Sequence, residues 1–176
     1  EISDWRLVTD SFLFEKISRF RIAKLPNETG GVLIGSYDTA RRIIYVVDAI
    51  PAPPDSVEWP TVFIRGSKGL RQEVERIEKV TAGQLKYVGE WHSHPWGVGA
   101  EPSSDDLTAF SWLSKIMGDE GLPTLMLIAA DENEHNFILG YKGLSGQNKL
   151  FFHSHVGNSA NTEVEFNHGS KSARCL

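Results

Sequence analysis

The most informative stretch of the chain is Gly89–Pro95, Gly-Glu-Trp-His-Ser-His-Pro, followed by Pro102–Asp106, Pro-Ser-Ser-Asp-Asp. Residues two apart on a strand point to the same face, so His92 and His94 can reach one ion. The following turn and helix can fold Asp106 back toward the end of that strand. Two imidazoles and one carboxylate, with a fourth position open, form a ligand set that suits catalytic zinc.

Each fragment also has a simpler interpretation. Two histidines at a strand edge are often polar surface residues, and Ser103-x-x-Asp106 alone is a helix capping box. The two fragments occur in the right order, however, with Pro95 and Pro102 framing the loop between them. Together they favour a metal site.

The sequence on either side predicts a mixed α/β domain. We expect strands at residues 32–36, 43–50, 61–65, 85–94, 125–130, 136–141 and 149–153, and helices at 9–24, 68–82 and 103–117. The first helix would be capped by Thr9 or Ser11, the first two strands resemble an antiparallel hairpin, and residues 50–59 are expected to form a loop. The pattern indicates one central, mostly antiparallel sheet with flanking helices.

Size and charge narrow the classes of function. A chain of 176 residues is expected to form one domain. It carries 18 basic and 23 acidic side chains, a net charge of -5, and its basic residues are scattered, so we expect no nucleic-acid partner. The apolar runs fall far short of the roughly 20 residues that a bilayer span requires, so we expect no membrane partner.

The two ends of the sequence are informative about the cellular compartment and about the extent of the domain. The first residues contain neither an initiator Met nor a secretory signal, as expected for a cytoplasmic protein or a domain of a longer one. The single cysteine, Cys175, excludes an intrachain disulfide and a cysteine-rich zinc site. We expect the domain to cover residues 1–156 and the polar residues 157–176 to form a frayed tail.

The motif resembles that of the JAMM or MPN-plus (JAB domain) zinc metalloproteases, and the compact length resembles their prokaryotic branch. That family combines a distant Glu, then His-x-His-Pro, then Ser-x-x-Asp, here Glu28, His92–Pro95 and Ser103–Asp106. The resemblance implies an MPN/JAB-like (cytidine-deaminase-like) fold. Ser103 and Asp106 lie one residue further from His94 than is usual in the family, which leaves Asp105 as an alternative ligand.

The resemblance also implies roles for these residues. His92, His94 and Asp106 would hold Zn²⁺, and Glu28 would take the proton of the attacking water and pass it to the leaving amine. The Ser103 hydroxyl would donate a hydrogen bond to the developing oxyanion. Glu90, two residues before His92, is an alternative base or a partner that orients an imidazole.

Other aromatic and histidine residues have weaker expected roles. Trp96, in the loop beside the motif, is expected to contact the substrate, and residues 50–65 to form one wall of a groove for an extended peptide tail. The second His-x-His, His153–His155, lacks the following Pro and Ser-x-x-Asp and is expected to end a strand. We expect His135 and His168, in polar surroundings, to be solvated.

By resemblance, the function is hydrolysis of the amide bond after the C-terminal tail of ubiquitin or a ubiquitin-like protein, as deconjugation or precursor processing. Prokaryotic members often act beside ubiquitin-activating-like and conjugating-like enzymes, some of them in antiviral operons. Two alternatives stay open. One is a non-catalytic MPN scaffold, and the other is an amidase that acts on a sulfur-carrier protein or a small peptide.

Overall fold

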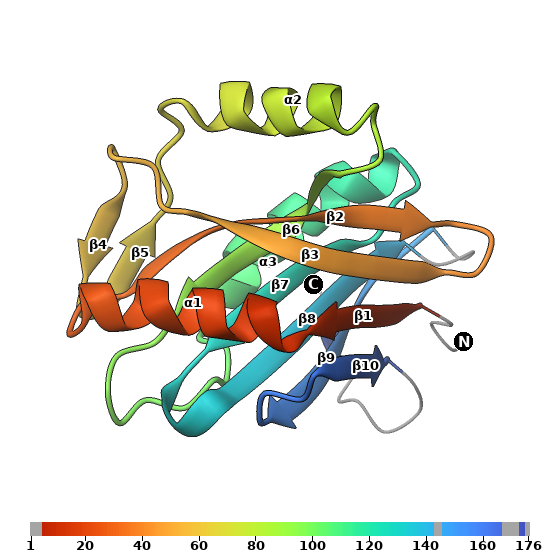
Figure 1. Ribbon diagram of the computed structural model, residues 1–176. Helices are drawn as coiled ribbons and strands as arrows, with labels where there is room; N and C mark the ends of the chain where they lie inside the picture. The colour runs from red at the N-terminus through yellow and green to blue at the C-terminus, as the bar shows by residue number, and fades with distance from the viewer. Residues whose placement is uncertain (1–4, 143–145, 167–172, 175–176) are drawn as a thin grey trace.

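The computed structural model describes residues 5–142, 146–166 and 173–174. Helices cover both faces of one central sheet, with α1 in front and α3 behind in Figure 1. The helices are α1 (Ser11–Lys24), α2 (Leu70–Val80) and α3 (Ser104–Asp119), and a 3-10 turn, η1, covers Asp131–Asn133. The strands are β1 (Arg6–Asp10), β2 (Thr29–Asp38), β3 (Ile43–Pro51), β4 (Val57–Trp59), β5 (Val62–Ile64), β6 (Lys86–Ser93), β7 (Thr124–Ala129), β8 (Glu134–Lys142), β9 (Asn148–Val156), β10 (Asn161–Glu165) and β11 (Ala173–Arg174).

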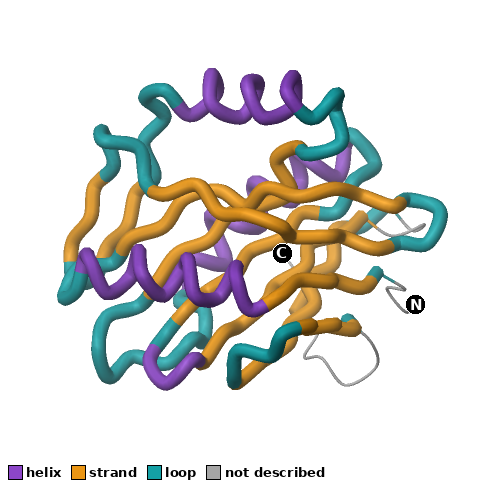
Figure 2. Tube along the Cα trace, viewed as in Figure 1, coloured by secondary structure: helices purple, strands orange, loops and turns teal. Residues whose placement is uncertain are grey.

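The main sheet has the strand order β10-β1-β3-β2-β6-β7-β8-β9-β11, and β4 and β5 form a separate hairpin. Within the described residues, only the pairs β1–β3 and β6–β7 are parallel. The expected mixed α/β class with a mostly antiparallel sheet is therefore confirmed. Figure 2 shows the helices arranged around this sheet, with α2 drawn above β2 and β3.

The β7 strand divides the hydrophobic core into two parts. Leu125 and Leu127 belong to the cluster that includes Phe14 of α1, whereas Met126 and Ile128 belong to the cluster that includes Phe110 of α3. Successive side chains of a strand point to opposite faces, which explains why a strand buried on both faces is apolar at every position. This central position lets the neighbouring strand β6 carry functional residues on a rigid support.

The local elements differ from the sequence expectations in three places. First, Thr9 lies in β1, and the cap of α1 is Asp10, whose Oδ1 accepts hydrogen bonds from the backbone N–H groups of Phe12 and Leu13. Second, β2 begins at Thr29, because Gly30 and Gly31 pair with β6. Third, the expected loop at 50–59 contains β4, which pairs with β5.

The frayed tail expected from residue 157 is wrong for residues 161–166. Residues 161–165 form β10, which pairs with β1 at the edge of the sheet. Thr162, Val164 and Phe166 are buried, so every second residue faces the core. The polar residues between them concealed this period-two pattern.

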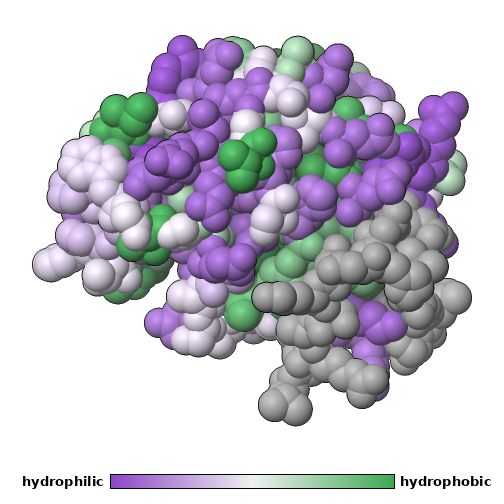
Figure 3. Space-filling model, turned by 90° about the horizontal axis from the view of Figure 1, so that it is seen from below, coloured by the Kyte–Doolittle hydropathy of each residue, from purple (hydrophilic) through white to green (hydrophobic). Residues whose placement is uncertain are grey.

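The face seen from below is largely hydrophilic, with hydrophobic residues in small separate groups (Figure 3). Among the described residues, no helix combines the length and the apolar character needed to span a bilayer.

Candidate metal centre

The two histidines of the motif meet at the end of β6. His92 lies in the sheet between Gly30 of β2 and Ile128 of β7, and His94 follows just after the strand. Both are buried, at 6% and 5% exposure, and their Nε2 atoms lie 3.3 Å apart. Their rings therefore converge on one point beside the sheet.

Asp106 completes this group from the first turn of α3. Its Oδ1 lies 3.3 Å from His92 Nε2, and its Oδ2 lies 3.7 Å from His94 Nε2. A tetrahedral zinc ion with bonds of about 2.0–2.1 Å holds its ligand atoms about 3.3–3.4 Å apart. The two distances from His92 Nε2 match this spacing and the distance between His94 and Asp106 is slightly longer, so the three side chains could hold one ion with a fourth position open. The described residues contain no other group of this kind.

The capping box of α3 fixes the position of Asp106. The Ser103 Oγ accepts a hydrogen bond from the backbone N–H of Asp106 at 3.1 Å, while Asp106 Oδ2 accepts from the Ser103 backbone N–H at 2.8 Å. The Ser103 hydroxyl also lies 2.7 Å from the same carboxylate oxygen. The simpler capping interpretation and the metal interpretation thus describe the same residues, because the cap holds the proposed ligand.

Hydrogen bonding also orients His94. Its Nδ1 lies 2.6 Å from the carbonyl oxygen of Gly99, in the loop between β6 and α3. When Nδ1 donates this bond, Nε2 is left unprotonated and directed at the shared point. The loop thus selects the ring nitrogen that faces a metal.

Burial and the neighbouring charges both shift the pKa values of the acidic groups at this site. Burial alone would raise the pKa of Asp106, but hydrogen bonds with His92 and His94 outweigh it and hold this pKa far below its usual range. Burial also raises the pKa of Glu28, an effect that His92 and His94 oppose and Asp106 supports. The pKa of Glu28 therefore depends on its burial and on the charges of all three residues.

The backbone places Glu28 at the start of β2. Its N–H donates to the carbonyl oxygen of Trp59 at 2.9 Å, which ties it to the β4–β5 hairpin. The β2–β6 pairing sets Thr29 opposite Ser93 and thus brings the preceding Glu28 to the histidine end of β6. The structure therefore brings together four of the residues that the motif predicts.

The family model for prokaryotic homologs of the JAB domain matches residues 11–138. The chain belongs to this family. The JAB domain is 37% identical over 113 residues to a protein named CD-NTase/cGAS isopeptidase from Enterobacter hormaechei subsp. hoffmannii, a match that covers 64% of this chain and 61% of that relative. It is 27% identical over 79 residues to a probable metalloprotease from Sinorhizobium fredii, covering 45% of this chain and 48% of that relative.

The chain thus spans less than two thirds of the length of either relative. Among solved structures, it is similar to a protein from Desulfitobacterium hafniense determined in solution, with a TM-score of 0.50 and 18% identity. That match covers 84% of this chain and 88% of the other, and it concerns the fold alone.

Glu90, the alternative base, is engaged elsewhere in the JAB domain. Its Oε2 lies 2.7 Å from Arg65 Nε, and its Oε1 lies 3.0 Å from Arg65 Nη2. The Tyr87 hydroxyl donates to Oε1 as well, at 3.1 Å. Because both oxygens have partners, the geometry favours Glu28 as the base.

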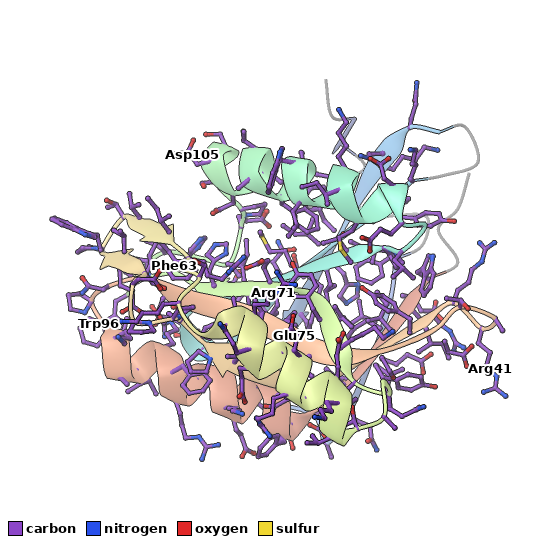
Figure 4. The ribbon with its side chains drawn as sticks, turned by 90° about the horizontal axis from the view of Figure 1, so that it is seen from above. Arg41, Phe63, Arg71, Glu75, Trp96 and Asp105 are labelled. Atoms are coloured by element: carbon purple, nitrogen blue, oxygen red, sulfur yellow. The ribbon has the colours of Figure 1, made fainter. Side chains whose placement is uncertain are left out.

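Asp105, the alternative ligand, is exposed and does not belong to the group of donors. Figure 4 shows it at the start of α3, at the same end of the molecule as Phe63 and Trp96. The register with Asp106 as the ligand is therefore the one that the geometry favours.

A groove of about 500 Å³ adjoins His92 and Asp106. Phe63 of β5 and Arg65, just after that strand, form one wall, as expected for part of residues 50–65, and Trp112 and Leu113 of α3 form another. Trp96, expected to contact substrate, is 68% exposed and is not part of this lining. Leu113 follows Asp106 by seven residues, two helical turns, which is the signal that could have identified this face of α3, and Trp112 lies next to it.

The other histidines differ from expectation in one case. His135 is buried, at 4% exposure, against the ring of Phe14, so its expected solvation is wrong. It alternates along β8 with residues of the opposite face, which is why its polar neighbours in the sequence are misleading. His153 and His155 lie within β9, where His155 stacks on Phe14, and His168 lies outside the described residues.

Proposed function

We propose that this JAB domain is a zinc-dependent isopeptidase or peptidase that cleaves the amide bond after the C-terminal tail of a ubiquitin-like protein. The observation that carries the proposal is the convergence of His92, His94 and Asp106, whose nearest donor atoms lie 3.3–3.7 Å apart, with Glu28 at the same end of the paired strands β2 and β6. An intact ligand set of this kind argues against a non-catalytic scaffold.

The chemistry follows from the donor set. A zinc ion held by the three ligands would supply Lewis acidity at its open fourth position. Glu28 accepts the proton of the attacking water and delivers it to the nitrogen of the leaving amine. Its raised pKa suits this role, because a base is most effective when its pKa lies nearer to the working pH.

Ser103 assists the same step. Its hydroxyl lies at the metal end of α3, within hydrogen-bond distance of the Asp106 carboxylate. Rotation about its Cβ–Oγ bond turns the proton without moving the oxygen, so the hydroxyl keeps its capping hydrogen bond and donates instead to the oxyanion that forms as water attacks the carbonyl. The hydroxyl needs no change of charge to do this.

The surface around the site favours a protein substrate over a small amide. Trp59, Trp96 and Trp112 are exposed by 65%, 68% and 67%, and they come from three different elements beside the donor group. Exposed tryptophans around a groove are typical of protein-binding surfaces. An extended tail in the groove, with a folded partner against these side chains, fits both features.

The relatives support the type of bond. One is named an isopeptidase of CD-NTase/cGAS and the other a probable metalloprotease. We therefore infer that the first conjugate to test is a CD-NTase-type protein in an amide linkage. Activating-like and conjugating-like enzymes would form this linkage, and the JAB domain would reverse it in the cytoplasm.

The test compares the zinc-loaded wild type with Glu28→Gln on three substrates: a CD-NTase conjugate, a linear ubiquitin-like fusion and a short peptide amide. Mass spectrometry locates the cleaved bond. We expect cleavage of a protein substrate after the tail, and a rate at least about 100-fold lower for Glu28→Gln with its zinc retained. Equal rates in the two proteins would refute the role of Glu28, and cleavage of the short amide alone would favour the amidase alternative.

A further inference from the structure

Arg21, in the last turn of α1, is a buried charged residue for which the proposed reaction has no role. It is 7% exposed, and it is the one buried side chain among the Lys, Arg, Asp and Glu residues that the structure describes. Burial of a guanidinium is costly unless hydrogen bonds and an opposite charge compensate it. The contacts of Arg21 therefore indicate what this helix end holds in place.

The guanidinium connects two segments that surround the metal centre. Its Nε donates to the backbone carbonyl oxygen of His94 at 2.9 Å, and its Nη2 donates to Asp131 Oδ1 at 2.6 Å. The other oxygen of Asp131 accepts a hydrogen bond from the backbone N–H of Gly97 at 2.8 Å. Arg21 and Asp131 thus hydrogen-bond to the main chain at His94 and at Gly97, on either side of Pro95 and Trp96. We call this pair the Arg21–Asp131 clamp.

His94 needs such support more than His92 does. His92 lies within β6, which is paired with β2 on one side and β7 on the other. His94 lies beyond the end of β6, where its N–H still donates to Ala129 but its carbonyl oxygen accepts from Arg21. The sheet therefore fixes the main chain of His92, and the hydrogen bond from Arg21 helps to fix that of His94 beyond the end of the strand.

The clamp is itself built on a constrained turn. Asp131 begins η1, in which Glu132 and Asn133 have φ angles of 54° and 58°. Non-glycine residues rarely adopt this left-handed region without a structural reason. The next residue, Glu134, accepts a hydrogen bond from Ala100, so the turn holds the metal loop at a second point.

We propose that Arg21 and Asp131 are positioning residues for the metal, which hold the His94 main chain so that Nε2 stays at ligand distance from His92 and Asp106. This inference rests on the proposed zinc site. Partners that orient a metal ligand typically contribute 10–100-fold to metal affinity, about 1–3 kcal/mol. We expect the clamp to act mainly on zinc binding, because its atoms touch the main chain of a ligand and not the reacting groups.

The experiment measures zinc affinity by competition with a chromophoric chelator, in proteins whose metal-free melting temperatures are also recorded. The variants are Arg21→Gln, Asp131→Asn and the double variant. Arg19→Gln is the control, since Arg19 is exposed on the same helix. We expect each single change to weaken zinc binding about 10–100-fold, and the double change to weaken it no further than the larger single effect. The control should bind like the wild type.

A Co²⁺-loaded sample gives an independent readout. We expect the visible absorption of bound Co²⁺ to change in both single variants and to stay unchanged in Arg19→Gln, because the spectrum reports ligand geometry and not overall stability. If Arg21→Gln fails to fold, Asp131→Asn carries the test, since the Asp131 side chain is 37% exposed and lies outside the helix α1.

Two outcomes separate the inference from the function on which it rests. The clamp alone would be refuted if both single variants bound zinc as tightly as the wild type and kept its Co²⁺ spectrum. It would also be refuted if the losses of zinc affinity in the two single variants added up in the double variant. A wild-type protein that binds no zinc would refute the metal site itself, and the clamp with it.

Discussion

His135 allows the acid stability of the domain to be tested at a single residue. The centroid of its ring lies 4.5 Å from the centroid of the Phe14 ring, and His135 pairs with His155 across the β8–β9 ladder. Burial, followed by the charge of His155, lowers the pKa of His135 from 6.5 to about 4. A buried histidine that stays neutral must cost stability when the solution becomes acidic.

The sign and size of this effect follow from the pKa. Above pH 6.5, His135 is neutral in both the folded and the unfolded chain, so its contribution is constant. As the pH falls from 6.5 to about 4, the unfolded chain binds a proton that the folded chain does not, and the free energy of unfolding decreases. A shift of about 2.5 units at 1.36 kcal/mol each gives a loss of about 3 kcal/mol.

The assay is urea unfolding of the wild type and His135→Leu between pH 7 and pH 4. We expect the free energy of unfolding of the variant, relative to that of the wild type, to rise by about 3 kcal/mol over this range. His153→Leu is the control, because burial also lowers the pKa of His153 but that side chain is less buried, so the change should be smaller. Parallel pH profiles for the wild type and His135→Leu would refute the reasoning.

Three further predictions concern the site. Ser103→Ala should lower kcat about 100-fold or more with little change in KM, measured by steady-state kinetics, because it removes an oxyanion donor; an effect on KM alone would contradict this. Gly30→Ala should lower the free energy of unfolding by about 1–3 kcal/mol in urea titrations. The added Cβ would lie 2.3 Å from Phe63 Cε1 and 2.4 Å from the Trp91 carbonyl oxygen, and both are too close. An unchanged free energy of unfolding would contradict this packing around Gly30. Trp112→Ala should raise KM for a protein substrate while leaving the hydrolysis of a short peptide amide unchanged, and equal effects on both would argue against a protein-binding rim.

Local patterns predicted much of the fold and the metal centre. The expected strands at residues 85–94 and 125–130 rest on short-range signals, and both segments are strands of the sheet. His92, His94 and Asp106 are also close in sequence, so strand and helix geometry alone suggests that they meet. Glu28 lies far from them along the chain, and only the resemblance to a family pointed to it.

The features that sequence reasoning missed depend on contacts between distant segments. β10 pairs with β1, more than 150 residues earlier in the chain, and its polar residues resemble those of a loop. Arg21 and Asp131 lie 110 residues apart, and neither belongs to a recognisable motif. The burial of His135 depends on α1 lying over that part of the sheet, which no local pattern specifies.

The most direct test of the central claim is the zinc content of purified, untagged protein by elemental mass spectrometry, for the wild type, His94→Ala, Asp106→Ala and Asp105→Ala. We predict about one zinc per chain in the wild type and in Asp105→Ala, and none in His94→Ala or Asp106→Ala. A wild type without zinc after supplementation, or zinc that is lost with Asp105 and kept without Asp106, would contradict the assigned metal centre.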